Sequence, residues 1–188
     1  MLLSAQAGVV THAQAREHGF SARQIEFRAE SGKWRRIHRG IYTTFTGKPP
    51  REAQLWAALL WAGKGAMISH ETAAELQGLA EEQSETIHVT VPSSRRPLGN
   101  PMPGVVIHRS NQSRCDGVAP LKLPRTRIED TVLDLVATAR TADDAYRWVS
   151  RAVADGKVSA EGLRRALDRR KRFPGRKWLS DVLAGHVE

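Results

Sequence analysis

Four polar side chains within residues 21–28 have the types and the helical spacing needed to read the edges of DNA bases. They are Ser21, Arg23, Gln24 and Arg28, and they fall on or near the face opposite the apolar Ile25. Arginine can pair bidentately with guanine O6 and N7, and glutamine with adenine N6 and N7, if their helix enters a major groove. The spacing therefore predicts a recognition helix.

A run of basic side chains follows this segment directly. Its members are Lys33, Arg35, Arg36, His38 and Arg39. They lie on a predicted hairpin, where cations would meet phosphates or a minor groove. Residues 11–42 hold seven Arg or Lys against three Glu, which favours a polyanion as partner. The alternative is a solvated basic face on a helix-turn-helix that contacts protein.

A second basic cluster occupies residues 164–177, where Asp168 is the only acidic residue. Three interpretations are open: a second DNA surface, a docking site for an acidic protein, or the solvated side of an amphipathic helix. The arginines assigned to this candidate surface are Arg164, Arg165, Arg169, Arg170 and Arg172.

The histidines do not predict a metal site. His70-Glu71 lacks the second histidine that a zincin helix needs. His88 and His108 could face each other across a strand pair, but no cysteine or further histidine completes a metal set there, so both are expected to be surface residues.

The carboxylates do not predict an active site either. Asp155-Gly-Lys157 has the spacing of half a nuclease site, but it falls on a predicted turn between helices and no carboxylate precedes it on a strand. Asp130 and Asp134 share a helix face, a spacing that is usually plain surface. No glycine-rich phosphate loop and no Ser-His-Asp order is present in the sequence. We expect no catalytic residue, no metal and no cofactor.

The composition fits a globular protein with an acidic partner. Over 188 residues the formal net charge is +9 and the isoelectric point is about 10.4, a balance for which nucleic acid is the commonest partner. The charge is uneven, at +5 over residues 1–48, −4 over 49–90 and +8 over 91–188. A single cysteine, Cys115, excludes an internal disulfide. The sequence shows no secretory signal and no membrane-spanning stretch, so we expect a cytoplasmic protein.

The elements that would position the first basic group form a winged helix-turn-helix. Thr11 and Ser21 are the expected N-caps of two helices, with a turn at Gly19 between them. Strands are expected over 34–37 and 41–44, joined by a short turn that contains a glycine. We assign residues 1–48 to this DNA-binding domain.

Residues 51–188 are expected to form a second, α+β domain. Alternating apolar residues predict strands over 86–91 and 104–109, an antiparallel pair with a long connection over 92–103. A short strand is expected over 66–68 and another over 118–123. Thr126 and Glu129 have the spacing of a capping box. Further helices are expected over 51–62, after Ser69, after Thr141, after Ser159 and around 178–183.

The order of these motifs resembles the AbiEi family of antitoxins from type IV toxin–antitoxin systems. The resemblance is carried by VVTHAQAREHGFSARQIEFRAESGKWRRIHRGIY, then SHETAAELQGL, IHVTVP with GVVIHRS, and LPRTRIEDTVLDLV. It implies an N-terminal winged helix that represses its own operon by binding inverted repeats. It also implies a region from about residue 51 onward that counters a nucleotidyltransferase-like toxin.

The sequence thus predicts an α+β protein with an N-terminal winged helix, a small antiparallel sheet and a helical C-terminal end. Its expected function is that of a sequence-specific DNA-binding antitoxin and autorepressor, with double-stranded DNA and a nucleotidyltransferase-like toxin as partners. The alternatives are an orphan winged-helix regulator and a protein-interaction module that docks an acidic partner without binding DNA.

Overall fold

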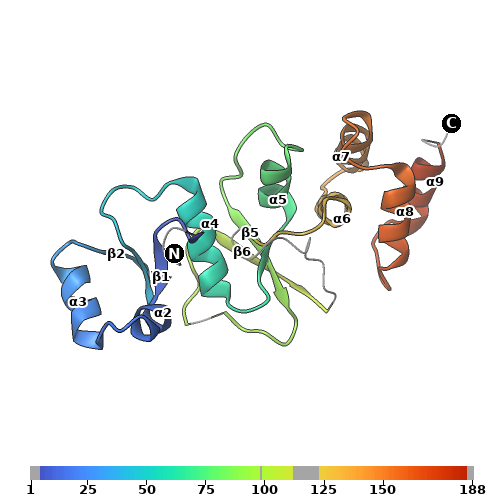
Figure 1. Cartoon of the computed structure of the whole chain (residues 1–188). Helices are drawn as coiled ribbons and strands as arrows, with labels where there is room; N and C mark the ends of the chain where they lie inside the picture. The colour runs from blue at the N-terminus through green and yellow to red at the C-terminus, as the bar shows by residue number, and fades with distance from the viewer. Residues whose placement is uncertain (1–4, 98, 112–122, 186–188) are drawn as a thin grey trace. The chain divides into compact units, whose positions relative to one another are not determined.

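The structure is a computed structural model that describes residues 5–97, 99–111 and 123–185 (Figure 1). The described chain divides into two compact units. The first holds residues 5–68, most of 89–111, and 123–124; the second holds residues 69–88 and 125–185. The strand expected over 118–123 lies almost wholly outside the described residues.

The N-terminal winged helix is present, with one strand more than the sequence predicted. Its elements are β1 (Val9–Thr11), α2 (His12–Glu17), α3 (Ala22–Glu30), β2 (Arg35–His38) and β3 (Ile41–Thr43). The sheet has the order β1-β3-β2 with antiparallel neighbours. β1 has only three residues, too few for a pattern of alternation to be recognised, and its pairing with β3 joins residues far apart in the chain.

Local hydrogen bonds define both helices of this module. Thr11 and Ser21 are the N-caps of α2 and α3, and each forms a reciprocal capping box with a glutamine three residues later. The predicted caps are therefore confirmed. Between the helices and the sheet lies a small core made of Val10, Ala15, Ile25, Trp34 and Tyr42.

The same unit continues into α4 and a second sheet. α4 (Arg51–Ala62) is buried over most of its length and packs against β1 and β3. β4 (Met67–Ile68), β5 (Ile87–Pro92) and β6 (Val105–Ser110) follow in the sheet order β4-β5-β6. β4 pairs antiparallel with β5, and Met67 lies opposite Thr90.

The second unit is helical. Leucines and valines on the inward faces of its helices form one core, which includes Val132, Leu135, Val149, Leu163 and Leu179. The helices are α5 (His70–Gln77), α6 (Ile128–Thr138), α7 (Ala142–Ala154), α8 (Ala160–Asp168) and α9 (Arg176–Ala184). The predicted α+β class with a small antiparallel sheet and a helical C-terminal end is confirmed.

Of the four N-caps predicted in the second unit, two have the predicted side-chain hydrogen bond. Ser69 is the N-cap of α5, as predicted, but it makes no side-chain cap hydrogen bond. Thr141 and Ser159 accept the backbone N–H groups of residues three positions on, as predicted. The capping box predicted at Thr126 is wrong: α6 has Arg127 as its N-cap, without a side-chain cap. The Thr126 hydroxyl is buried and is hydrogen-bonded to the Thr131 hydroxyl at 2.7 Å instead. None of the described helices is long and apolar enough to cross a membrane.

Candidate nucleic-acid interface

Two of the predicted base-reading residues hold the N-terminus of α3. Ser21 Oγ accepts the Gln24 backbone N–H at 3.1 Å, and the Ser21 backbone N–H donates to Gln24 Oε1 at 2.7 Å. Bidentate pairing with adenine needs both the oxygen and the nitrogen of the glutamine amide. In this conformation Gln24 Oε1 accepts the hydrogen bond of the cap. The NH₂ group of Gln24 is then the part of its amide that can donate to a base.

Substitutions at Ser21 separate its role in capping α3 from its predicted role in DNA contact. We expect Ser21→Ala to lower the free energy of unfolding by about 1 kcal/mol, because the Gln24 N–H loses its acceptor. Ser21→Asp should keep the cap and the stability, yet weaken DNA binding because the new carboxylate would face phosphates. Thermal melts and fluorescence anisotropy of labelled duplex DNA measure the two effects. Equal DNA affinity for Ser21→Asp and the parent would show that this end of α3 stays away from the duplex.

Arg28 is held by two aromatic rings. Its guanidinium lies over the rings of Phe20 and Trp34, at 4.9 Å and 5.6 Å from their centroids, and these rings meet edge to face at 5.3 Å. Such cation–π contacts fix the direction of the side chain without neutralising its charge. Arg28 is thus a pre-oriented cation at the C-terminal end of α3.

An ion pair connects α3 to the hairpin. The Arg36 guanidinium of β2 lies 2.6 Å from Glu26 Oε1 of α3, and both side chains are 49% exposed. The hydrogen bond that Arg36 donates to Glu26 raises the pKa of Arg36. Tyr42, whose ring lies 5.5 Å from the guanidinium, makes a smaller contribution in the same direction. The contact joins α3 to the hairpin, but it also offsets the charge of Arg36.

The turn of the hairpin is anchored within the first unit. The His38 ring meets the Trp61 ring of α4 edge to face at 6.1 Å. Arg35 donates to the carbonyl of Gly47 at 3.3 Å, and Arg39 is exposed beside Gly40 at the turn. The His38 ring is half-buried and packs on α4, and its predicted role in DNA contact stays a prediction.

The remaining cations of the group are fully available. Arg23 on α3 and Lys33 before β2 are exposed, and neither makes an ion pair with any residue that the structure describes. Phe27, which the sequence analysis did not single out, is 60% exposed on α3. Its position two residues after the buried Ile25 was the available signal, because that spacing turns a side chain to the opposite face of a helix.

The second basic cluster is not one surface. Arg170 is 4% exposed, and its guanidinium lies 2.9 Å from Asp134 Oδ1 and 3.3 Å from Asp130 Oδ1. It also donates to the Asp130 carbonyl at 2.9 Å. The prediction that Arg170 belongs to an exposed surface is therefore wrong. The prediction that Asp130 and Asp134 are plain surface is wrong as well, since both are 4% exposed and hold this arginine.

The other arginines of this cluster stay on the outside of the second unit. Arg165 pairs with Glu161 one turn earlier on α8, at 2.5 Å. This is the ordinary arrangement of a solvated helix face. Arg164, Arg169 and Arg172 are exposed. Their role as a second DNA surface stays a prediction.

The histidine and carboxylate motifs are placed as follows. His70 is buried at the start of α5, with a φ of 51°, and its ring stacks on that of His88 at 5.7 Å. Burial lowers the pKa of His88, while Glu71, whose Oε2 lies 3.3 Å from His88 Nε2, acts in the opposite direction. A further histidine therefore does lie beside His88, contrary to expectation.

Asp155 follows α7 on a turn, as predicted, and lies 3.7 Å from Arg151.

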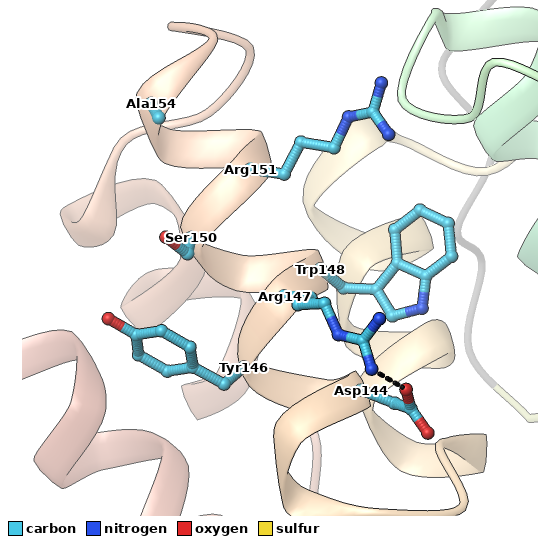
Figure 2. Close-up of a pocket in the computed structure, with 7 residues that line it drawn as sticks. All are labelled: Asp144, Tyr146, Arg147, Trp148, Ser150, Arg151 and Ala154. Atoms are coloured by element: carbon cyan, nitrogen blue, oxygen red, sulfur yellow. Dashed lines mark hydrogen bonds and ion pairs between the residues drawn. The ribbon is translucent and has the colours of Figure 1, made fainter.

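A pocket of about 540 Å³ lies along α7. Figure 2 shows the side chains that line it. Its lining comes from this helix alone, with Tyr146 46% exposed and Arg147 paired with Asp144 at 2.8 Å. Polar groups from one helix do not converge on a ligand as those of several elements do. An exposed tyrosine beside arginines is a composition typical of protein interfaces.

Comparison with known proteins agrees with the geometry of the N-terminal module. Residues 1–44 match the family described as "Transcriptional regulator, AbiEi antitoxin". The match spans the winged helix up to the end of β3 and includes every residue assigned to DNA contact there. The resemblance to the AbiEi antitoxins is thus confirmed in this segment. No curated protein matches the chain.

The whole chain has a structural relative. The crystal structure of the RV2827C protein from Mycobacterium tuberculosis aligns over 100% of this chain and 76% of its own, with a TM-score of 0.62 and 20% sequence identity. At that identity the likeness concerns the fold alone. A fold similar to this one therefore occurs in a solved protein.

Proposed function

We propose that this chain is a sequence-specific DNA-binding antitoxin that represses its own type IV toxin–antitoxin operon. The proposal proceeds from the match of residues 1–44 to the AbiEi transcriptional regulators. Residues 1–48 are its DNA-binding domain, and the region from residue 51 onward counters a nucleotidyltransferase-like toxin. The family is one of regulators, and we assign no catalytic residue.

The observation that carries the proposal is the ion pair between Arg36 and Glu26. It joins β2 to α3, the two elements to which most of the candidate cations belong. A helix and a basic hairpin presented together can contact a major groove and the adjoining phosphates. Arg28, oriented by Phe20 and Trp34, is our candidate for base contact, and Arg23 and Lys33 are our candidates for phosphate contact.

The proposal is tested with DNA from upstream of the chain's own gene. We expect a complex with a duplex that contains an inverted repeat, and an affinity that falls steeply as salt rises. The two phosphate contacts proposed for Arg23 and Lys33 would give a slope of log affinity against log salt of about −1.8. Fluorescence anisotropy between low and moderate salt measures it, with a scrambled duplex of equal length as the control.

The proposal is contradicted if the chain binds neither duplex at low salt, or binds both equally with no preference for the repeat. Either result is expected of a protein-interaction module. A salt-insensitive complex with an acidic protein, together with no shift of upstream DNA, would favour that alternative.

A further inference from the structure

A pocket beside the hairpin turn is not explained by DNA binding. It lies within the first unit, has a volume of about 620 Å³, and is lined by the start of α2, the turn at Arg39, the later part of α4 and residues 63–66. Arg95 and Pro124 complete the lining. Several elements contribute to it, and its volume is in the range of small-molecule sites, about 300–1,000 Å³.

One wall of this pocket is apolar and contains an unsatisfied donor. Trp56, Leu59 and Leu60 of α4 line it at helical spacing. Trp56 is 7% exposed, and its indole Nε1 has no hydrogen-bond partner among the residues that the structure describes. A buried N–H without an acceptor is costly, and buried tryptophans usually find one. Nε1 is itself closed to solvent, so it is the rest of the Trp56 side chain that lines the pocket.

The rest of the lining is positively charged. Arg39, Lys64 and Arg95 all line the pocket, and no aspartate or glutamate does. Within the described part of the chain, none of the three forms an ion pair. Such a site takes an anion, because an anion would find unpaired cations without having to displace a carboxylate.

The backbone allows Arg95 to lie close to the end of α4. A Cβ atom at Gly63 would lie 2.8 Å from Arg95 Nη2 and 3.0 Å from its Nε. Gly63 has a φ of 87°, in the left-handed region that favours glycine. The guanidinium thus lies directly against the backbone at the rim of the pocket, where a larger residue at position 63 would have to move it.

We propose that this pocket binds a small organic anion. Its apolar or aromatic body would pack on Trp56, Leu59 and Leu60. Its carboxylate, phosphate or sulfonate would be held by Arg39, Lys64 and Arg95. Arg39 also belongs to the hairpin assigned to DNA, so a bound anion and a duplex would compete for it. This last consequence rests on the proposed DNA-binding function.

The probe for the test is 8-anilino-1-naphthalenesulfonate, an aromatic anion whose fluorescence rises in apolar sites. We expect saturable binding at one site per chain. The double variant Lys64→Gln/Arg95→Gln should weaken that binding at least tenfold, which corresponds to about 1.4 kcal/mol. Trp56→Phe, which keeps an aromatic ring and removes the N–H, should weaken it less. The matched control is Arg96→Gln, since Arg96 is exposed next to Arg95 and does not line the pocket.

Three outcomes would overturn the proposal. The first is binding that does not saturate. The second is binding that the double variant leaves unchanged. The third is an affinity for the uncharged analogue N-phenyl-1-naphthylamine that equals the affinity for the probe. Circular dichroism checks that the variants are folded, which we expect because Lys64 and Arg95 are exposed.

The link to DNA is measured separately. Probe at a concentration that saturates the parent chain should weaken the binding of the upstream duplex, because two ligands that compete lower each other's affinity reciprocally. The same concentration should weaken duplex binding less in the double variant, which binds less probe. If the chain binds the probe but binds no DNA, the proposed function is rejected and the proposed anion site still stands. DNA binding that the probe never affects would reject the competition for Arg39.

Discussion

Arg170→Ala is expected to lower the free energy of unfolding of the helical second unit by about 3–5 kcal/mol. The guanidinium lies between Asp130 and Asp134, which are each 4% exposed. Its removal leaves two carboxylates buried close together without a cation. Loss of one partner from a buried ionic group is costly because the remaining charge has neither water nor a counter-ion.

Urea denaturation followed by circular dichroism measures this change through the transition midpoint. The matched control is Arg164→Ala, which removes an exposed arginine of the same cluster and should change stability by no more than about 0.5 kcal/mol. If the two variants are equally stable, Arg170 is an exposed side chain, as the sequence predicted. A loss of DNA affinity in Arg170→Ala without any loss of stability would have the same meaning.

Arg28→Ala is expected to have the largest effect on DNA binding, a loss of about 1–3 kcal/mol, or roughly 5- to 150-fold in affinity. Its side chain is already oriented by Phe20 and Trp34, so little conformational entropy is lost when it contacts a base. Arg36→Ala should weaken binding by less, since its charge is shared with Glu26. Anisotropy titrations with the inverted-repeat duplex compare the two.

Two controls separate contact from folding. Arg147→Ala removes the same charge from α7 in the second unit and should leave DNA affinity unchanged. A thermal melt of Arg28→Ala measures what the two cation–π contacts contribute to stability, about 0.5–1 kcal/mol each at exposed sites. Unchanged DNA affinity in both Arg28→Ala and Arg36→Ala would show that helix α3 and the hairpin are not the DNA-binding surface.

The features that sequence reasoning predicted correctly are the local ones. The N-caps at Thr11, Ser21, Thr141 and Ser159 depend on hydrogen bonds that join residues three positions apart. These bonds form within one turn of helix and need no partner from elsewhere in the chain. The winged helix is likewise visible in order and spacing alone. The DNA-contacting roles of its side chains stay predictions.

The sequence by itself determined four of the helix caps, the approximate positions of the longer strands and the basic character of the N-terminal module, because each is encoded within a few residues. Tertiary structure decided which charges remain available. Arg170 is buried by carboxylates 36 and 40 positions away, Arg36 is paired across ten positions, and His38 packs on a ring of α4. A basic run predicts charge but not exposure, since exposure depends on which distant elements pack against it.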